Sequence, residues 1–288
     1  MSAINRFNEI IEIQVSIQNH KDFSLMTQVF AEGLWEMCAS NSSFYNYFFK
    51  KERIITFNLL MSLVLSNGIS SLSEFYTLCG KNKISGKNNT IGFVDYMVRT
   101  GRVVFIRGGD RRRKTLALTE KGRKDLDYLF LKKLAPLSIY DSTIDCSSLL
   151  TDDFYRNYYK KKNLVWVTSS RHNFDSTFVD SQHFLEIQSK SAGLFFLMKI
   201  LMDVRKCNVK VGERLSGSYF KTISSKVGVS PSHSLNLIAL LVEGGAVEKI
   251  GVDYVIRDEL LKGVEHIISL NLAVNYLIIK KDLDDDKV

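Results

Sequence analysis

The most concentrated chemistry in this sequence is a run of basic residues beside a pair of glycines. Residues 107–114 read RGGDRRRK, and the cations among them are Arg107, Arg111, Arg112, Arg113 and Lys114. A guanidinium group stays charged at physiological pH and matches the geometry of phosphate oxygens through paired N–H donors. Gly108 and Gly109 permit a tight turn at little steric cost. The pattern predicts a short loop that binds a polyanion.

A second group of polar residues stands at the start of a helix predicted over residues 87–100. Its members are Lys87, Asn88, Asn89 and Thr90. Such side chains can read base edges in a major groove, because asparagine pairs with adenine through two hydrogen bonds and lysine reaches guanine or phosphate. The plainer interpretation is that two asparagines at a helix start serve only capping and solvation. Both interpretations stay open at this point.

Neither catalysis nor metal binding is expected. The five histidines and four cysteines are scattered, and none of them has the spacing of metal ligands. The sequence has no GxSxG, no HExxH and no glycine-rich phosphate loop. The four cysteines are interpreted as reduced thiols of a cytosolic protein. No enzyme activity and no cofactor are therefore predicted.

The basic run and the polar helix start lie within a series of predicted elements whose order is typical of a known fold. Helices are predicted over residues 53–66, up to Cys79 and over 87–100, strands over 102–106 and 115–118, and a further helix after Thr119, a plausible N-cap. The basic loop joins the two strands. This is the order of a winged helix, in which the short helix pair is a helix-turn-helix and the hairpin is the wing.

The same order returns in the second half of the chain. Helices are predicted over residues 191–206, 219–228 and 231–243, then a hairpin over 246–256 and a long helix over 258–279. Ser230 is expected to cap the 231–243 helix, with Pro231 at its first position. The groove-facing candidates are then Ser232 and His233. This second unit has no arginine at its hairpin tip, so it either binds DNA weakly or serves dimerisation or docking.

The predicted fold is mainly α with small β-hairpin wings, an α+β tandem of winged helix-turn-helix domains. Its parts are an N-terminal helical segment for dimerisation or packing (1–50), a first winged helix (51–135), a connector (136–190) and a second winged helix with a C-terminal helix (191–288). Within the connector, residues 152–162 predict a helix and residues 164–170 a strand.

Residues 57–122 resemble a MarR-type winged-helix transcription regulator, most specifically in the wing. The residues that carry the resemblance are GRVV at 101–104, DRRR at 110–113 and LALTEKG at 116–122. The resembled family shows an apolar strand after a glycine, an Asp-Arg-Arg wing tip and a Leu-Thr-x-x-Gly start to the next helix. The resemblance implies that Asp110 positions an arginine of the wing. Two winged helices in one chain depart from the family's usual single one, and they also resemble plasmid replication initiators.

The charge distribution agrees with a nucleic-acid partner. The chain has a net charge of +8, and residues 81–133 alone hold 15 Lys/Arg and 5 Asp/Glu, a net of +10. Neutralised phosphates release condensed counterions, so concentrated positive charge favours binding to double-stranded DNA. A solvated basic surface is the plainer alternative. The predicted function is a sequence-specific, DNA-binding transcription regulator, with a replication initiator or a winged-helix docking factor as alternatives.

Further expectations concern oligomers, location and ligands. Residues 22–38 and 258–279 carry apolar faces beyond the needs of either winged helix, which predicts a homodimer. No apolar run approaches the roughly 20 residues of a membrane span, so a cytoplasmic protein of the bacterial nucleoid without a membrane partner is expected. Aromatic runs at 44–49 and 154–159 can line a pocket, although core or interface packing is more usual. No small-molecule effector is identified.

Overall fold

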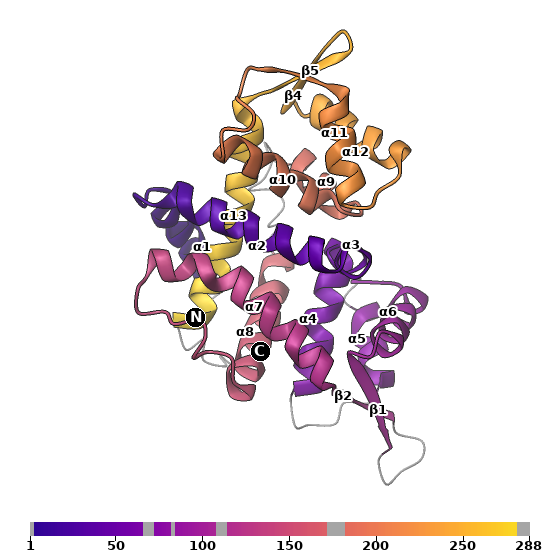
Figure 1. Cartoon of the computed structure of the whole chain (residues 1–288). Helices are drawn as coiled ribbons and strands as arrows, with labels where there is room; N and C mark the ends of the chain where they lie inside the picture. Colours follow the sequence, from indigo (N-terminus) through magenta and orange to yellow (C-terminus); the bar gives the residue numbers. More distant parts are fainter. Residues whose placement is uncertain (1–2, 66–71, 82–83, 108–113, 172–181, 281–288) are drawn as a thin grey trace.

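The computed structural model describes residues 3–65, 72–81, 84–107, 114–171 and 182–280. Within them the chain is mainly helical with small antiparallel strand hairpins, as the sequence predicts (Figure 1). Residues 108–113, with Asp110 and the three arginines of the predicted wing tip, lie outside the described residues.

Long helices pack together in the middle of the molecule (Figure 1). They are α1 (Ala3–Gln18), α2 (Phe23–Ser40), α4 (Lys51–Leu65), α7 (Glu120–Tyr140), α8 (Asp152–Arg171) and α13 (Asp258–Lys280). α2 packs on α7 and on α10 (Gly193–Arg205), α1 packs on α13, and α4 packs on α8. Apolar side chains at helical spacing, such as Met26, Phe30 and Leu34 of α2, bury the facing sides of these helices.

The apolar faces that predicted a homodimer are covered within the chain itself. Met26 and Leu34 of α2 are buried against α7 and α10, and Leu272 and Leu277 of α13 are buried in the same core. α1, which lies in the predicted N-terminal helical segment, packs along α13. The premise of the dimer prediction is therefore wrong for these faces, and dimerisation itself stays a prediction.

The first small unit lies at one end of the molecule (Figure 1). It consists of α5 (Leu72–Lys81), α6 (Lys87–Arg99), β1 (Val103–Arg107) and β2 (Lys114–Leu118). β1 and β2 pair antiparallel, and Val103 lies opposite Leu118. Thr119 caps α7 directly after the hairpin, as predicted.

The second small unit lies at the other end (Figure 1). It consists of α9 (Gln182–Ser189), α10, β3 (Arg214–Ser216), α11 (Gly217–Lys226), α12 (Pro231–Glu243), β4 (Val247–Ile250) and β5 (Asp253–Ile256). In the described residues, β3, β5 and β4 form an antiparallel sheet in that order. The Ser230 side chain accepts the cap hydrogen bond of α12 and Pro231 occupies its first turn, as predicted.

α3 (Ser42–Phe48) connects the two small units. On one side, the ring of its Tyr47 stacks on Tyr96 of α6, with the ring centroids 3.9 Å apart. On the other side, buried Asn46 donates a hydrogen bond to the Val227 carbonyl at the end of α11. Residues of the aromatic run at 44–49 therefore contact both small units, which lie far apart in the sequence.

The predicted strand at 164–170 is wrong, because α8 continues through these residues to Arg171. Asp152 and Asp153 stand in the first turn of α8, where negative charge favours the helix dipole. Extending a formed helix costs far less than nucleating one, so a β-branched stretch that follows a strong start is drawn into it. Strand propensity is a weak guide in this context.

Candidate nucleic-acid interface

A buried arginine fastens the base of the β1–β2 hairpin to the helices behind it. Arg102 is 3% exposed, and its Nε lies 2.8 Å from Asp125 Oδ2 of α7. The guanidinium also lies over the Phe44 ring of α3, 3.3 Å from its centroid. Arg102 is thus one cation of the basic segment that the fold uses internally and that no phosphate can reach.

The hairpin ends on a close contact with the first turn of α7. Thr119 Oγ1 accepts from the Gly122 amide at 3.0 Å and donates to the Gly101 carbonyl at 2.6 Å. A Cβ at Gly122 would stand 2.1 Å from the Arg102 carbonyl oxygen, so only glycine permits this approach. These contacts give a physical reason for the Leu-Thr-x-x-Gly pattern: it docks the hairpin onto the helix.

The hairpin itself presents apolar side chains. Val104 and Ile106 of β1 are each about half exposed, at 47% and 49%. Arg107 and Lys114 lie opposite each other as the last pair of the register. Among the predicted contacts, Arg111, Arg112 and Arg113 lie outside the described residues, as does the supporting Asp110.

The first turn of α6 is open to solvent, with one exception. Lys87, Asn88 and Asn89 are exposed, and Gly86 at the N-cap supplies no side chain to the turn. Thr90 is fully buried, and its hydroxyl donates to the Gly86 carbonyl at 3.2 Å. The prediction for Thr90 is therefore corrected: at α6 position four it stands on the inner face beside Phe93 and Val94, so it stabilises the helix start instead of facing a groove.

The structure divides the cations of the +10 segment into two classes. Arg102, Arg123, Lys124 and Lys132 each form an ion pair with an acidic side chain. Lys81 of α5 and Lys87 and Arg99 of α6 are exposed, and no carboxylate of the described residues pairs with them. Among the described side chains of α5 and α6, Lys81, Lys87 and Arg99 thus carry charge that no carboxylate of the described residues pairs with.

Two further cations stand beside the start of α6, and the sequence analysis missed them. Lys50 and Arg53 share a surface hollow of about 440 Å³ with Asn88 and Asn89. Arg53 donates to the Tyr47 carbonyl at 2.7 Å and lies over the Tyr47 ring, so its guanidinium is held in place.

Burial and the neighbouring Arg53 lower the pKa of Lys50, and the Glu52 carboxylate in the same hollow partly offsets this shift. The sequence signal for this pair was the KKER stretch after the aromatic run, but only the fold brings it to α6. The hollow thus adds Lys50 and Arg53 to the candidate interface.

The start of α12 in the second unit is docked against the chain. The His233 ring nitrogen Nε2 lies 2.8 Å from the Ser191 carbonyl oxygen, a hydrogen bond that turns the side chain inward. α9 packs along α12, and its His183 side chain is closely packed against Gly244. The prediction for His233 is corrected accordingly, because its ring binds the turn after α9. Ser232 remains exposed.

Within the described residues, no group of His, Cys, Asp or Glu is placed to hold a metal ion. In the same part of the chain, no helix is both long and apolar enough to cross a membrane. Comparison with models of known families, with curated proteins and with solved structures finds no match to this chain. The resemblance to MarR-type regulators stays a prediction carried by the wing residues.

Proposed function

We propose that the protein binds double-stranded DNA through its first small unit and acts as a transcription regulator built from tandem winged helices. In this proposal α6 enters the major groove, and the β1–β2 hairpin lies along the backbone as a wing. The observation that carries the proposal is the exposed first turn of α6, with Lys87 and Arg99 unpaired among the described residues and Lys50 and Arg53 in the adjoining hollow.

The division of roles follows from the chemistry of each side chain. Asn88 and Asn89 offer paired donor and acceptor groups, which suit base edges. Lys87, Arg99 and Lys50 offer positive charge, which suits phosphates. Contacts of this kind fix the position of the protein on the duplex without reading the base sequence. The first group should therefore set sequence preference, and the second group overall affinity and its salt dependence.

The test measures binding of labelled 30-base-pair duplexes by fluorescence anisotropy at several salt concentrations. We expect Lys87→Ala with Arg99→Ala to weaken binding to all sequences and to flatten the plot of log affinity against log salt by about two, one for each lost phosphate contact. Asn88→Ala should leave non-specific binding unchanged and relax the preference at one base pair, at a cost of about 1–3 kcal/mol on the preferred site.

The matched control removes the same charge elsewhere. Lys21→Ala with Lys262→Ala changes two exposed residues outside the first small unit and should barely alter affinity. Equal losses of DNA affinity in the two double variants would mean that net charge alone causes the effect. Unchanged binding in the Lys87 and Arg99 variant would overturn the assignment of α6 to the groove.

One observation favours a docking role for the second unit. Leu235 of α12 is 58% exposed and Val252 at the β4–β5 turn is 85% exposed, and exposed apolar side chains suit contact with a protein. Arg257 of this unit pairs with Glu248. If α12 contributes nothing to DNA binding, a protein partner for this unit is the second candidate function.

A further inference from the structure

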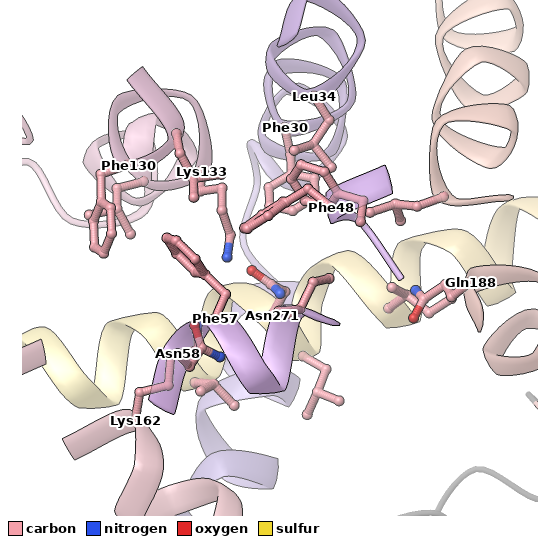
Figure 2. Close-up of a pocket in the computed structure, with 18 of the residues that line it drawn as sticks. Phe30, Leu34, Phe48, Phe57, Asn58, Phe130, Lys133, Lys162, Gln188 and Asn271 are labelled. Atoms are coloured by element: carbon pink, nitrogen blue, oxygen red, sulfur yellow. The ribbon is translucent and has the colours of Figure 1, made fainter. Parts of the chain in front are cut away.

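A cavity of about 260 Å³ lies where α2, α4, α7, α8 and α13 meet, beside α9 and α10 (Figure 2). Phe130 stands edge-on to two rings of its inner wall, with its centroid 4.6 Å from Tyr158 and 5.9 Å from Tyr159. The aromatic side chains of the wall are Phe30, Phe48, Phe49, Phe57, Phe130, Tyr158 and Tyr159. Such a lining suits a compact apolar body.

Two lysines enter this apolar space from neighbouring helices, Lys133 from α7 and Lys162 from α8. Figure 2 shows the Lys133 ammonium directed between Phe57 and Asn271. Lys162 Nζ donates to the Tyr158 hydroxyl at 2.7 Å. Within the described residues, neither ammonium group has a carboxylate partner.

Both lysines point toward the cavity because of their positions on their helices. Lys133 follows the buried Leu129 by four residues and Phe130 by three, and Lys162 stands in the same relation to Tyr158 and Tyr159. Residues three and four apart share one face of a helix. Each lysine therefore extends from the inner face of its helix along the cavity and stays partly exposed.

The remaining polar groups of the wall add hydrogen-bond donors. Asn275 Nδ2 donates to Asn271 Oδ1 at 2.9 Å, and Figure 2 shows the Asn271 carboxamide near the Lys133 ammonium. Asn58 and Gln188 contribute further amides. Among the described residues of the wall there is no Asp, Glu or His.

An uncompensated pair of cations in an apolar wall is costly to the folded protein. Burial lowers the pKa of Lys133 to about 8, and burial together with the Lys133 charge lowers the pKa of Lys162 well below its usual range. Tyr158 and Tyr159 also face the cavity, and burial raises the pKa of both, so neither supplies a negative charge at neutral pH. No described side chain of the wall therefore supplies a negative charge to the two lysines.

We infer that this cavity binds a small monocarboxylate with an apolar body, held with its carboxylate at Lys133 and Lys162 and its body among the aromatic rings. A dry cavity of about 150 Å³ accepts benzene, so a cavity of about 260 Å³ has room for two fused rings or a medium-length acyl chain. The inference rests on the cavity alone and does not depend on DNA binding by the first unit.

Isothermal titration calorimetry of the full chain with 2-naphthoate, decanoate and the neutral 2-naphthamide tests this inference. We expect at least one carboxylate to bind and the amide to bind at least tenfold more weakly. Binding near pH 7.5 should take up about one proton, seen as a dependence of the heat on buffer ionisation, because the carboxylate restores the charge of the second lysine. Affinity should fall as the pH rises through 8. Preference for naphthoate or decanoate tells whether the body is a ring system or a chain.

Matched variants separate the cavity from general charge. Lys133→Met and Lys162→Met should each weaken carboxylate binding by roughly 10- to 100-fold, as for the loss of a charge-assisted hydrogen bond. Lys132→Met is the control, because Lys132 precedes Lys133 on α7 but pairs with Glu36 outside the cavity. Far-UV circular dichroism confirms the fold of each variant. Equal binding of amide and carboxylate, equal loss in all three variants, or no binding of either carboxylate at millimolar concentration overturns the inference.

Discussion

Replacing Lys133 with methionine should make the protein more stable at neutral pH. The ammonium of Lys133 lies among aromatic rings beside Lys162, and no acid of the described residues compensates it. Its pKa is about 8 in the folded protein, against an ordinary value of 10.5. At about 1.4 kcal/mol per pH unit, that difference amounts to roughly 3 kcal/mol for keeping the charge in the cavity. Methionine keeps most of the methylene packing and removes the charge, so we expect a gain of about 1–3 kcal/mol.

The dependence of stability on pH gives this prediction a second signature. The folded protein releases the Lys133 proton near pH 8, whereas the unfolded chain holds it up to about pH 10.5. The unfolded state then binds more protons between these values, so the free energy of unfolding rises with pH in this window. The penalty is fully present below pH 8 and is lifted as the pH rises. The Lys133→Met variant should show a smaller rise than the wild type.

Urea unfolding followed by tryptophan fluorescence at pH 7.5, 8.5 and 9.5 measures both effects. Measurements stop at pH 9.5, because buried tyrosines with raised pKa values oppose the trend once unfolded tyrosine ionises near pH 10. Lys132→Met, which loses only a partly exposed ion pair with Glu36, should change stability by less than about 1 kcal/mol and leave the pH trend unchanged. A Lys133→Met variant that is less stable than wild type, with an unaltered pH trend, would refute the reasoning.

Three further changes test other parts of the structure. Gly122→Ala places a methyl group 2.1 Å from a backbone carbonyl oxygen, so we expect urea unfolding to show a loss of about 3 kcal/mol or more. Asn46→Ala removes the buried hydrogen bond to Val227 that connects the two small units, and should cost about 1–3 kcal/mol in the same assay. Arg111→Ala with Arg112→Ala should flatten the salt dependence of DNA binding by about two; an unchanged slope would mean that the wing does not touch DNA.

The local elements were largely predictable from the sequence, because their signals are local. The α6 start at Lys87, the Thr119 cap and the Ser230–Pro231 start of α12 all follow from residue types within a few positions. β3 has only three residues and no alternating pattern, so nothing in its own sequence distinguishes it from a loop. It forms because β5 offers it a free edge, which is a property of the folded unit.

The assignment of apolar faces to partners was not predictable in the same way. A buried helical face shows its periodicity in the sequence, but the sequence does not say which surface covers it. The faces of α2 and α13 were assigned to a second copy of the chain, whereas α7, α10 and α1 of the same chain cover them. Likewise, His233 stands at a helix position that predicts contact with a DNA groove, but its ring hydrogen-bonds to the Ser191 carbonyl in the turn after α9. Both errors come from contacts between residues far apart in the chain.

The sequence analysis did not single out the two lysines of the cavity, although their positions carry a signal. Lys132 and Lys133 are neighbours, and successive helix residues point about 100° apart, so the two side chains lie on different parts of the helix surface. The apolar positions Leu126, Leu129 and Phe130 fix the inner face, and Lys133 falls on it while Lys132 falls beside it. The same relation of a lysine to the apolar face of its helix recurs at Lys162 on α8. Both lysines line the cavity between the central helices, where we infer that a carboxylate binds.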